Sequence, residues 1–275
     1  MITIDQNKGI RVLSLFDGIS GGRVALERAG IPVETYYASE IDKYAIQVAQ
    51  KNYPDTIQIG DVCKVDFTQY VGKVDMIIGG SPCQDLSIAK QNRQGLQGER
   101  SRLFWEYIKA LTIIKPKYFL LENVASMKNE DRDAITAVLR GIYPETECVM
   151  INSALVSAQQ RKRYYWTNWH VEQPEDKGIL LKDILTSGTT SRKKSKTIRS
   201  KGWNSGWGNK HEFDMPNEYR NYTLAELELL QNLPVGYTYG VSTSQARKLI
   251  GNGWTVDVIA HIFKQIPTAE QKDNK

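Results

Sequence analysis

The segment 79–87, GGSPCQDLS, places Cys83 in a polar turn directly after the apolar run VDMII. A thiol raised on such a turn at the end of a strand could act, as its thiolate, as a nucleophile. A single cysteine is more often a small buried hydrophobe, but the polar neighbours of Cys83 are poor context for a core. Cys63 and Cys148 lie in apolar surroundings, and we expect both to be structural.

Acidic and basic side chains lie in two further segments. LLENV at 120–124 puts Glu122 at the end of an apolar run, where loss of solvent would favour the neutral acid and suit a proton donor; a solvated carboxylate is the alternative. The segment QQRKR places Arg161 and Arg163 two positions apart, so on a strand both would point to one face. Guanidinium groups bind carboxylates, phosphates or the carbonyl oxygens of bases.

A glycine-rich turn, FDGISGG at 16–22, separates the apolar run RVLSLF from the helix-like GRVALERAG. Glycines allow the backbone to approach a ligand, and a helix N-terminus favours a polar or anionic group. The spacing differs from the GxGxxG dinucleotide motif, and a tight turn without a ligand explains the segment equally well. Glu40 and Asp61, however, follow two later apolar runs, where acids accept hydrogen bonds from ribose hydroxyls. Together these features favour a cofactor that carries a nucleoside.

Residues 11–165 alternate strand-like apolar runs with segments of helical period. The expected strands lie at 11–16, 34–39, 74–80 and 117–123, and the expected helices lie at 22–30, 42–52, 101–114 and 131–143. This alternation predicts an α/β fold with a doubly wound, mostly parallel sheet that helices cover on both faces. Ligands of such sheets bind at the carboxyl ends of the strands, where the glycine-rich and acidic residues fall.

The alternation ends after residue 167. Residues 192–201 carry six basic side chains and no acid, within a stretch rich in Gly, Ser, Asn and Trp. Such a run is either a solvated charged loop or a surface for phosphate groups. Helical patterns return at 223–234 and 255–266. The expected organisation is a catalytic and cofactor-binding α/β domain at 1–167, a small basic insert at 168–222, C-terminal helices at 223–267 of which the last returns to the first domain, and a frayed tail at 268–275.

Composition excludes several classes of protein. The 275 residues are 41% apolar and 24% charged with a net charge of +5, which is ordinary for a soluble globular domain. No apolar run approaches the roughly 18 residues of a membrane helix, and the charged N-terminal segment is unlike a signal peptide. The three cysteines and three histidines show neither a disulfide framework nor a metal-ligand spacing. These features favour a cytoplasmic protein with reduced thiols, no metal and no contact with membranes.

Taken in order, FDGISGG, SPCQDLS, ENV, QQRKR, the basic insert and GNGWTVDVIA resemble the motif series of the cytosine-5 DNA methyltransferases, over essentially the whole chain. Details such as SLFDGISGG, SRLFWE and the tryptophan of GNGWTV resemble the de novo branch known from eukaryotes, as does the short insert. The lack of an N-terminal regulatory domain resembles instead a bacterial or phage enzyme. The final motif often reads Gly-Asn-Ser in the family, and here Gly253 and Trp254 stand in place of the serine and the residue after it.

The resemblance implies a fold of the S-adenosylmethionine-dependent methyltransferase type, with the basic insert as target-recognition region. The cofactor would be S-adenosyl-L-methionine, bound by Phe16, Gly18, Ile19, Gly21, Glu40, Ile41, Asp61, Val62, Pro82, Leu103, Asn252, Gly253 and Trp254. The partner would be double-stranded DNA, contacted by Ser87, Lys90, Arg93 and Arg100 in a closing loop and by Lys193, Lys194, Lys196 and Arg199 in the insert. A cognate restriction endonuclease is a further expected partner, and a monomer is favoured.

The resemblance also implies the catalytic roles of Cys83, Glu122, Arg161 and Arg163. Cys83 would add to C6 of cytosine, Glu122 would stabilise charge at N3, and Arg163 would do so at O2. Because this chemistry does not fit inside a stacked duplex, the base would be flipped into the site. The base that removes the C5 proton is not identified by the sequence.

Three other functions remain as alternatives. An RNA cytosine-5 methyltransferase is the nearest, but its family relative carries Cys-Phe-Thr after ENV, whereas this chain reads ENVASMKNE. A nicotinamide oxidoreductase would share the sheet but needs the GxGxxG spacing. A non-catalytic DNA-binding relative would be expected to have lost Cys83 or the glycine-rich turn. The sequence therefore favours methylation of DNA.

Overall fold

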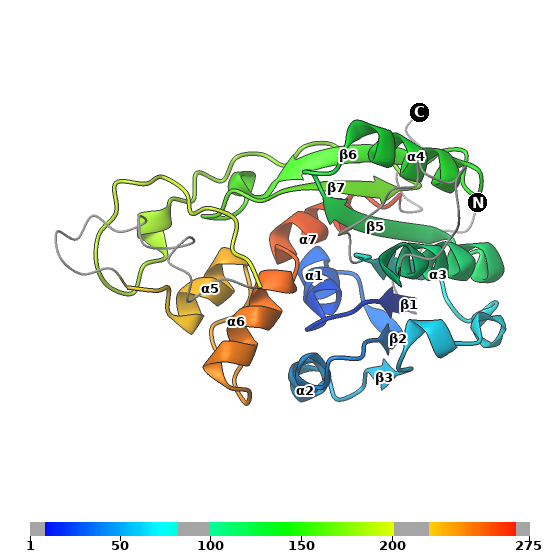
Figure 1. Cartoon of the computed structure of the whole chain (residues 1–275), viewed down its shortest axis with the longest axis horizontal. Coiled ribbons are helices and arrows are strands. Elements are labelled where there is room, and N and C mark those ends of the chain that lie inside the picture. Colours follow the sequence, from blue (N-terminus) through cyan, green and yellow to red (C-terminus); the bar gives the residue numbers. More distant parts are fainter. Residues whose placement is uncertain (1–8, 82–98, 201–219, 268–275) are drawn as a thin grey trace.

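The computed structural model describes residues 9–81, 99–200 and 220–267, and for 99–101 it describes the backbone alone (Figure 1). Seven strands form one sheet in the order β3-β2-β1-β4-β5-β7-β6. Their bounds are β1 Ile10–Leu15, β2 Val33–Ser39, β3 Ile57–Gln58, β4 Met76–Gly79, β5 Tyr118–Val124, β6 Glu147–Asn152 and β7 Lys162–Thr167. The first five strands pair in parallel, whereas β7 runs antiparallel to both β5 and β6. The predicted mostly parallel α/β sheet is confirmed.

Helices cover both faces of the sheet. The α-helices are α1 Gly21–Ala29, α2 Lys43–Asn52, α3 Glu99–Ile114, α4 Asn129–Arg140, α5 Leu224–Leu230, α6 Thr243–Asn252 and α7 Val256–Lys264. Short 3₁₀ helices are η1 Val62–Lys64, η2 Phe67–Tyr70, η4 Ser153–Leu155 and η5 Leu181–Asp183. One core cluster joins α1, α2 and α7 to the sheet, and a second joins α3 and α4 to the opposite face.

Successive strand residues enter opposite cores, which explains the unbroken apolar runs in the sequence. On β4, Met76 and Ile78 belong to the core on the α1 side, and Ile77 belongs to the core on the α3 side. On β5, Leu120 and Leu121 divide in the same way. Central parallel strands are buried on both faces and therefore lack the alternation of polar and apolar residues.

Local sequence signals set several helix ends. Asp42 caps α2 by accepting a hydrogen bond from the Tyr44 amide, and Thr223 caps α5 in a capping box with Glu226. α5 ends at Leu230, four residues before the predicted end at 234. The reason is Asn232, whose left-handed φ of 56° turns the chain away from the helix.

The C-terminal helices connect the insert to the sheet. α7 packs beside α1, as Figure 1 shows, and the Trp169 indole donates a hydrogen bond to the Ile262 carbonyl of α7 (3.2 Å). A third, smaller core holds insert residues together with α5 and α6; its members are Ala158, Leu181, Ile198, Tyr222, Leu227, Leu230 and Ile250. Among the helices of the described ranges, none combines the length and the apolar character needed to cross a membrane.

Candidate active site

The predicted cofactor turn follows β1 and contains three residues with left-handed backbone. Phe16, Gly18 and Ser20 have φ of 59°, 60° and 58°. Non-glycine residues at such φ are strained and persist where the surroundings hold them. Asp17 does so here, because its buried carboxylate accepts hydrogen bonds from Ser20 Oγ (2.5 Å) and Tyr36 OH (2.8 Å). Burial raises the pKa of the Asp17 carboxyl. Asp17 lies inside the glycine-rich motif but was not among the residues predicted from the sequence to form the site.

Glu40, the residue after β2, connects the first two turns of this sheet edge. Its Oε2 accepts a hydrogen bond from the Gly18 amide (2.8 Å). Its Oε1 accepts two more, from the amides of Ile41 (2.7 Å) and Asp42 (2.8 Å). The side chain of Ile41 is 74% exposed at the same edge. The predicted pair Glu40–Ile41 thus combines an oriented carboxylate with an uncovered apolar side chain.

Four other predicted cofactor residues border the same edge. Asp61 accepts a hydrogen bond from the Cys63 amide (3.0 Å) and so begins η1. Val62 is buried in the core on the α3 side, and Phe16 and Leu103 pack partly buried against that core. These residues lie after β1, after β3 and on α3, and their role in binding a cofactor remains a prediction.

The turn after α6 approaches the turn after β1, although the two are more than 200 residues apart in the chain. An ideal Cβ on Gly253 would lie 3.8 Å from Ile19 Cδ1, and one on Gly21 would lie 3.9 Å from Trp254 Cβ. Asn252, the last residue of α6, is exposed. The two segments predicted to bind one cofactor are thus in contact.

Glu122, Arg163 and Trp254 form a connected group at this edge. Glu122 lies on β5 opposite Tyr165 of β7, and Arg163 lies two residues along β7 on the same face. Arg163 Nε forms an ion pair with Glu122 Oε1 (2.8 Å), and the two side chains are 14% and 12% exposed. Trp254 Nε1 donates to Glu122 Oε2 (3.2 Å). The two carboxylate oxygens of Glu122 are therefore both engaged in a nearly buried setting, Oε1 in the ion pair and Oε2 in the hydrogen bond.

Arg161 makes a different set of contacts from Arg163. Its buried guanidinium donates to the carbonyls of Ile198 (3.1 Å), Gly251 (3.3 Å) and Gly253 (3.0 Å). Burial lowers the pKa of Arg161 to about 10, so the group remains charged at neutral pH. These contacts join the insert to the turn after α6, and the catalytic role predicted for Arg161 remains a prediction.

Gln159 and Gln231 also hold this junction and were not singled out in the sequence. Gln159 is fully buried; its amide donates to the Leu230 carbonyl (3.0 Å), and its oxygen accepts from the Ile198 amide (2.8 Å). Gln231 donates to the Gly253 carbonyl (3.0 Å). The only signal for Gln159 was its place in the QQRKR motif.

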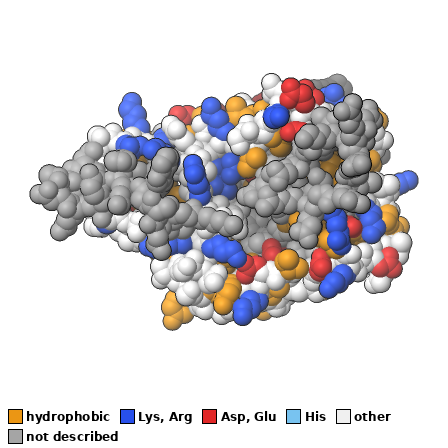
Figure 2. Space-filling model, viewed as in Figure 1, with side chains coloured by type: hydrophobic (Ala, Val, Ile, Leu, Met, Phe, Trp, Pro, Cys, Tyr) orange, Lys and Arg blue, Asp and Glu red, His pale blue; other side chains and the backbone are white. Residues whose placement is uncertain are grey.

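The basic insert contains lysines of two kinds. Lys193, Lys196 and Arg199 are exposed, and Figure 2 shows Lys and Arg side chains in the middle of the face in view. Lys194 instead directs its ammonium at the carbonyls of Ala154 (2.6 Å), Ser157 (3.0 Å) and Ile179 (2.5 Å). Burial lowers the pKa of Lys194. Because an ammonium has only three donors, the predicted phosphate contact of Lys194 is replaced here by a structural one.

Several predicted site residues lie outside the described part of the chain. They are Pro82, Cys83, Ser87, Lys90 and Arg93, and the side chain of Arg100 is likewise not described. Within the described ranges, no group of three or more His, Cys, Asp or Glu residues could hold a metal ion.

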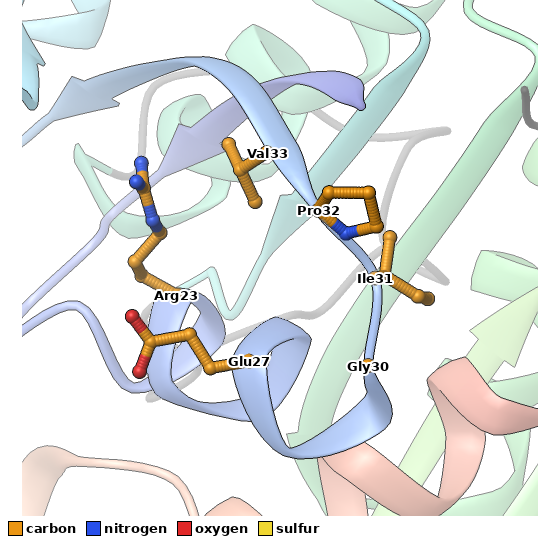
Figure 3. A pocket seen from close by; sticks show the side chains of 6 residues that line it. All are labelled: Arg23, Glu27, Gly30, Ile31, Pro32 and Val33. Atoms are coloured by element: carbon orange, nitrogen blue, oxygen red, sulfur yellow. The ribbon is translucent and has the colours of Figure 1, made fainter. Parts of the chain in front are cut away.

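A pocket of about 570 Å³ lies at the other end of β2, remote from the predicted site. Figure 3 shows its lining of Arg23, Glu27, Gly30, Ile31, Pro32 and Val33. Arg23 stacks between the Tyr36 and Tyr53 rings and pairs with Asp55 (2.8 Å). None of the predicted catalytic or cofactor residues lines this pocket.

The chain matches a known protein family over most of its length. The model of the C-5 cytosine-specific DNA methylases matches it in two overlapping segments, residues 10–180 and 142–268. The chain belongs to this family. The predicted resemblance to the cytosine-5 DNA methyltransferases is thereby confirmed.

Individual relatives are phage and bacterial proteins. The orphan methyltransferase M.Rho11sI of Bacillus phage rho11s is 33% identical over 209 residues, which are 72% of this chain and 41% of that protein. The type II methyltransferase M.NlaX of Neisseria lactamica is 27% identical and aligns with 94% of this chain and 96% of its own length. The chain spans about two fifths of the length of the phage relatives.

Solved structures share the fold. A Dnmt2 protein of Spodoptera frugiperda superposes with a TM-score of 0.73 and 20% identity, covering 94% of this chain and 99% of that one. The Entamoeba histolytica methyltransferase EhMeth superposes with a TM-score of 0.74 and 16% identity, covering 94% and 98%. The predicted methyltransferase-type sheet is therefore confirmed.

Proposed function

We propose that this chain transfers a methyl group from S-adenosyl-L-methionine to C5 of cytosine in double-stranded DNA. The observation that carries the proposal is the Glu122–Arg163 pair, held at 2.8 Å on one face of adjacent strands. Cytosine presents N3 and O2 side by side, so a carboxyl group and a guanidinium at neighbouring positions match them. Family membership supports the same reaction.

The residues at the sheet edge fit the proposed cofactor. Glu40 and Asp61 supply carboxylates for ribose hydroxyls and an adenine amino group, and the exposed Ile41 side chain offers an apolar surface for a ring. Gly18 has open space where a Cβ would stand, so the backbone is accessible to a ligand. When bound, S-adenosylmethionine supplies the electrophilic methyl group that the activated C5 takes.

Cys83, which lies outside the described residues, acts in this proposal as the nucleophile. Cytosine C5 is a poor nucleophile until a thiolate adds to C6, which places negative charge on N3 and O2 and makes C5 electron-rich. Glu122 stabilises the charge at N3, and Arg163 stabilises it at O2. After methylation a base removes the C5 proton, the electron pair restores the double bond, and the Cys83 thiolate leaves.

Double-stranded DNA is the proposed substrate, and the basic insert is its proposed contact. The exposed Lys193, Lys196 and Arg199 suit backbone phosphates. The target base must leave the stack to reach a site at the sheet edge. A cognate restriction endonuclease is a further proposed partner, and relatives that are named type II methyltransferases support it. A cytoplasmic location and a monomeric state also remain proposals.

Transfer of labelled methyl from S-adenosylmethionine tests the proposal directly. Mixed-sequence duplex DNA should become labelled, base-resolution mapping should place the label on cytosine C5, and the Cys83→Ala variant should be inactive under the same conditions. Structured RNA of mixed sequence is offered in parallel. Label on RNA alone, or on a base other than cytosine, would overturn the proposal.

A further inference from the structure

We propose that Trp254 is a positioning residue for Glu122, and that its indole N–H orients the carboxyl group that faces cytosine N3. This inference rests on the proposed function and adds to it a residue acting through Glu122. The observation behind it is the hydrogen bond from Trp254 Nε1 to Glu122 Oε2 (3.2 Å). Trp254 was expected only to contact the cofactor.

The hydrogen bond from Trp254 fixes the second oxygen of the Glu122 carboxyl group, which Arg163 alone does not fix. Arg163 Nε holds Oε1, and its Nη1 donates to the Lys162 carbonyl (2.9 Å), so the guanidinium is fixed by its own strand. A carboxyl group held at one oxygen can still rotate about its Cγ–Cδ bond. A second donor at Oε2 fixes the plane of the group, and a plane fixed in advance avoids reorganisation during the reaction.

Glycines at two positions make room for the indole. An ideal Cβ on Gly80 would lie 2.7 Å from Glu122 Oε2 and 3.0 Å from Trp254 Nε1. An ideal Cβ on Gly22 would lie 2.5 Å from Ile78 Cδ1 and 3.4 Å from Trp254 Cζ3. Any larger residue at Gly80 would therefore press on both atoms of this hydrogen bond.

The residues on both sides of Trp254 are anchored by hydrogen bonds, Gly253 through its backbone and Thr255 through its side chain. The Gly253 carbonyl accepts from Arg161 Nη2 (3.0 Å) and Gln231 Nε2 (3.0 Å). Thr255 Oγ1 donates to Gln231 Oε1 (2.8 Å) and accepts from Ser153 Oγ (2.9 Å). The indole is thus presented by a turn whose neighbours cannot move independently, as a positioning role requires.

The Trp254→Phe variant removes the N–H and keeps an aromatic ring. With the full chain, duplex DNA and S-adenosylmethionine, we expect the single-turnover rate of methyl transfer to fall about tenfold, as expected for a lost hydrogen bond to a carboxylate. The affinity for S-adenosylmethionine should stay within about twofold of wild type. In a Glu122→Ala background the same substitution should have no further effect on the rate, because the acceptor is gone.

Trp169→Phe is the matched control. Trp169 also donates its indole N–H at 3.2 Å, but to the Ile262 carbonyl in the core, so its loss should leave the rate unchanged. Gly80→Ala tests the same contact from the other side, and combined with Trp254→Phe it should lose no more than either single variant. If Trp254→Phe does not fold, the rate of methyl transfer by Gly80→Ala tests the inference in its place.

Three results would overturn the inference. They are an unchanged rate in Trp254→Phe, a rate loss of the same size in the Glu122→Ala background, and a loss confined to cofactor affinity. If Gly80→Ala stands in, an unchanged rate in that variant has the same meaning. Absence of methyl transfer to duplex cytosine by the wild type would instead contradict the proposed function itself.

Discussion

At the scale of single residues, the proposed chemistry depends on which cysteine thiol can form a reactive thiolate. Of the three cysteines, the two described ones are poor nucleophiles: burial raises the pKa of the Cys63 thiol and raises that of Cys148 to about 12. A thiol with a raised pKa is protonated at neutral pH, and the thiolate is the reactive form. The raised pKa values of Cys63 and Cys148 therefore make these two thiols poor candidates for the nucleophile role proposed for Cys83.

DNA containing 5-fluorocytosine tests that assignment. Fluorine at C5 cannot leave as a proton does, so the enzyme should remain covalently attached after methyl transfer. Proteolysis and mass spectrometry of the trapped complex should find the base on the peptide that contains Cys83. Recovery of the base on a peptide containing Cys63 or Cys148 would refute the assignment.

Glu122→Gln should slow the chemical step far more than it weakens DNA binding. The amide keeps the size of the side chain and can still accept from Arg163 or Trp254, but it cannot supply a proton. Loss of general acid assistance typically costs about 10²–10⁴-fold in rate. Single-turnover rates and duplex affinities, measured side by side, check this. If affinity fell and the rate did not, Glu122 would have a structural role only.

At the scale of elements, local patterns predicted more than long-range pairing. The apolar runs of β1, β4 and β5 and the caps of α2 and α5 are local features, and they were predictable. The antiparallel direction of β7 was not assigned, because strand direction depends on partners distant in the chain. The helix α6 was not assigned either. The hydrogen bond between Trp254 and Glu122 joins residues 132 positions apart, and nothing in either motif signals it.

The insert shows the same limit. The charge of its lysines alone did not indicate which of them are exposed and which one binds carbonyl groups of the protein. Lys193→Gln combined with Lys196→Gln should flatten the slope of log K against log salt for duplex binding by roughly 1.8, about 0.9 for each lost phosphate contact. Lys194→Gln should leave the slope unchanged and lower the free energy of unfolding by about 1–3 kcal/mol, because three partly buried carbonyls lose their donor.

Salt titrations of duplex affinity and denaturant unfolding of all three proteins, with a methylation map, separate the two roles. A flattened slope in Lys194→Gln would mean that Lys194 does contact DNA phosphates. An altered methylated sequence in the Lys193/Lys196 variant would mean that these lysines read bases and do more than contact the backbone.

At the scale of the whole molecule, buried polar groups hold the insert and the C-terminal helices against the sheet. Arg161, Gln159 and Gln231 bridge the insert to the turn after α6, and that turn carries Trp254 to Glu122. The insert proposed to bind DNA is thus connected by hydrogen bonds to Glu122, the carboxylate proposed to act in catalysis. The net charge of +5 favours the approach of a polyanion.

Glu226 makes the junction between the insert and α5 sensitive to acid. Its carboxylate is fully buried; it pairs with Arg220 (2.7 Å) and accepts hydrogen bonds from the amides of Thr186 and Thr223. Burial alone would raise the pKa, but the arginine and the amides outweigh it and hold the pKa of Glu226 at about 2, against 4.5 for a free side chain. The stabilisation is therefore complete above pH 4.5 and is lost as pH falls from there towards 2.

Glu226→Gln should consequently unfold more easily than wild type at pH 7, by up to about 3 kcal/mol, and the difference should shrink to near zero by pH 2. The measurement is denaturant unfolding of both proteins between pH 7 and pH 2.5. Asp133→Asn is the control, because Asp133 is 65% exposed beside Arg132 and such surface pairs contribute little at any pH. A difference between Glu226→Gln and wild type that stays constant down to pH 2.5 would show that the carboxylate charge does not stabilise this junction.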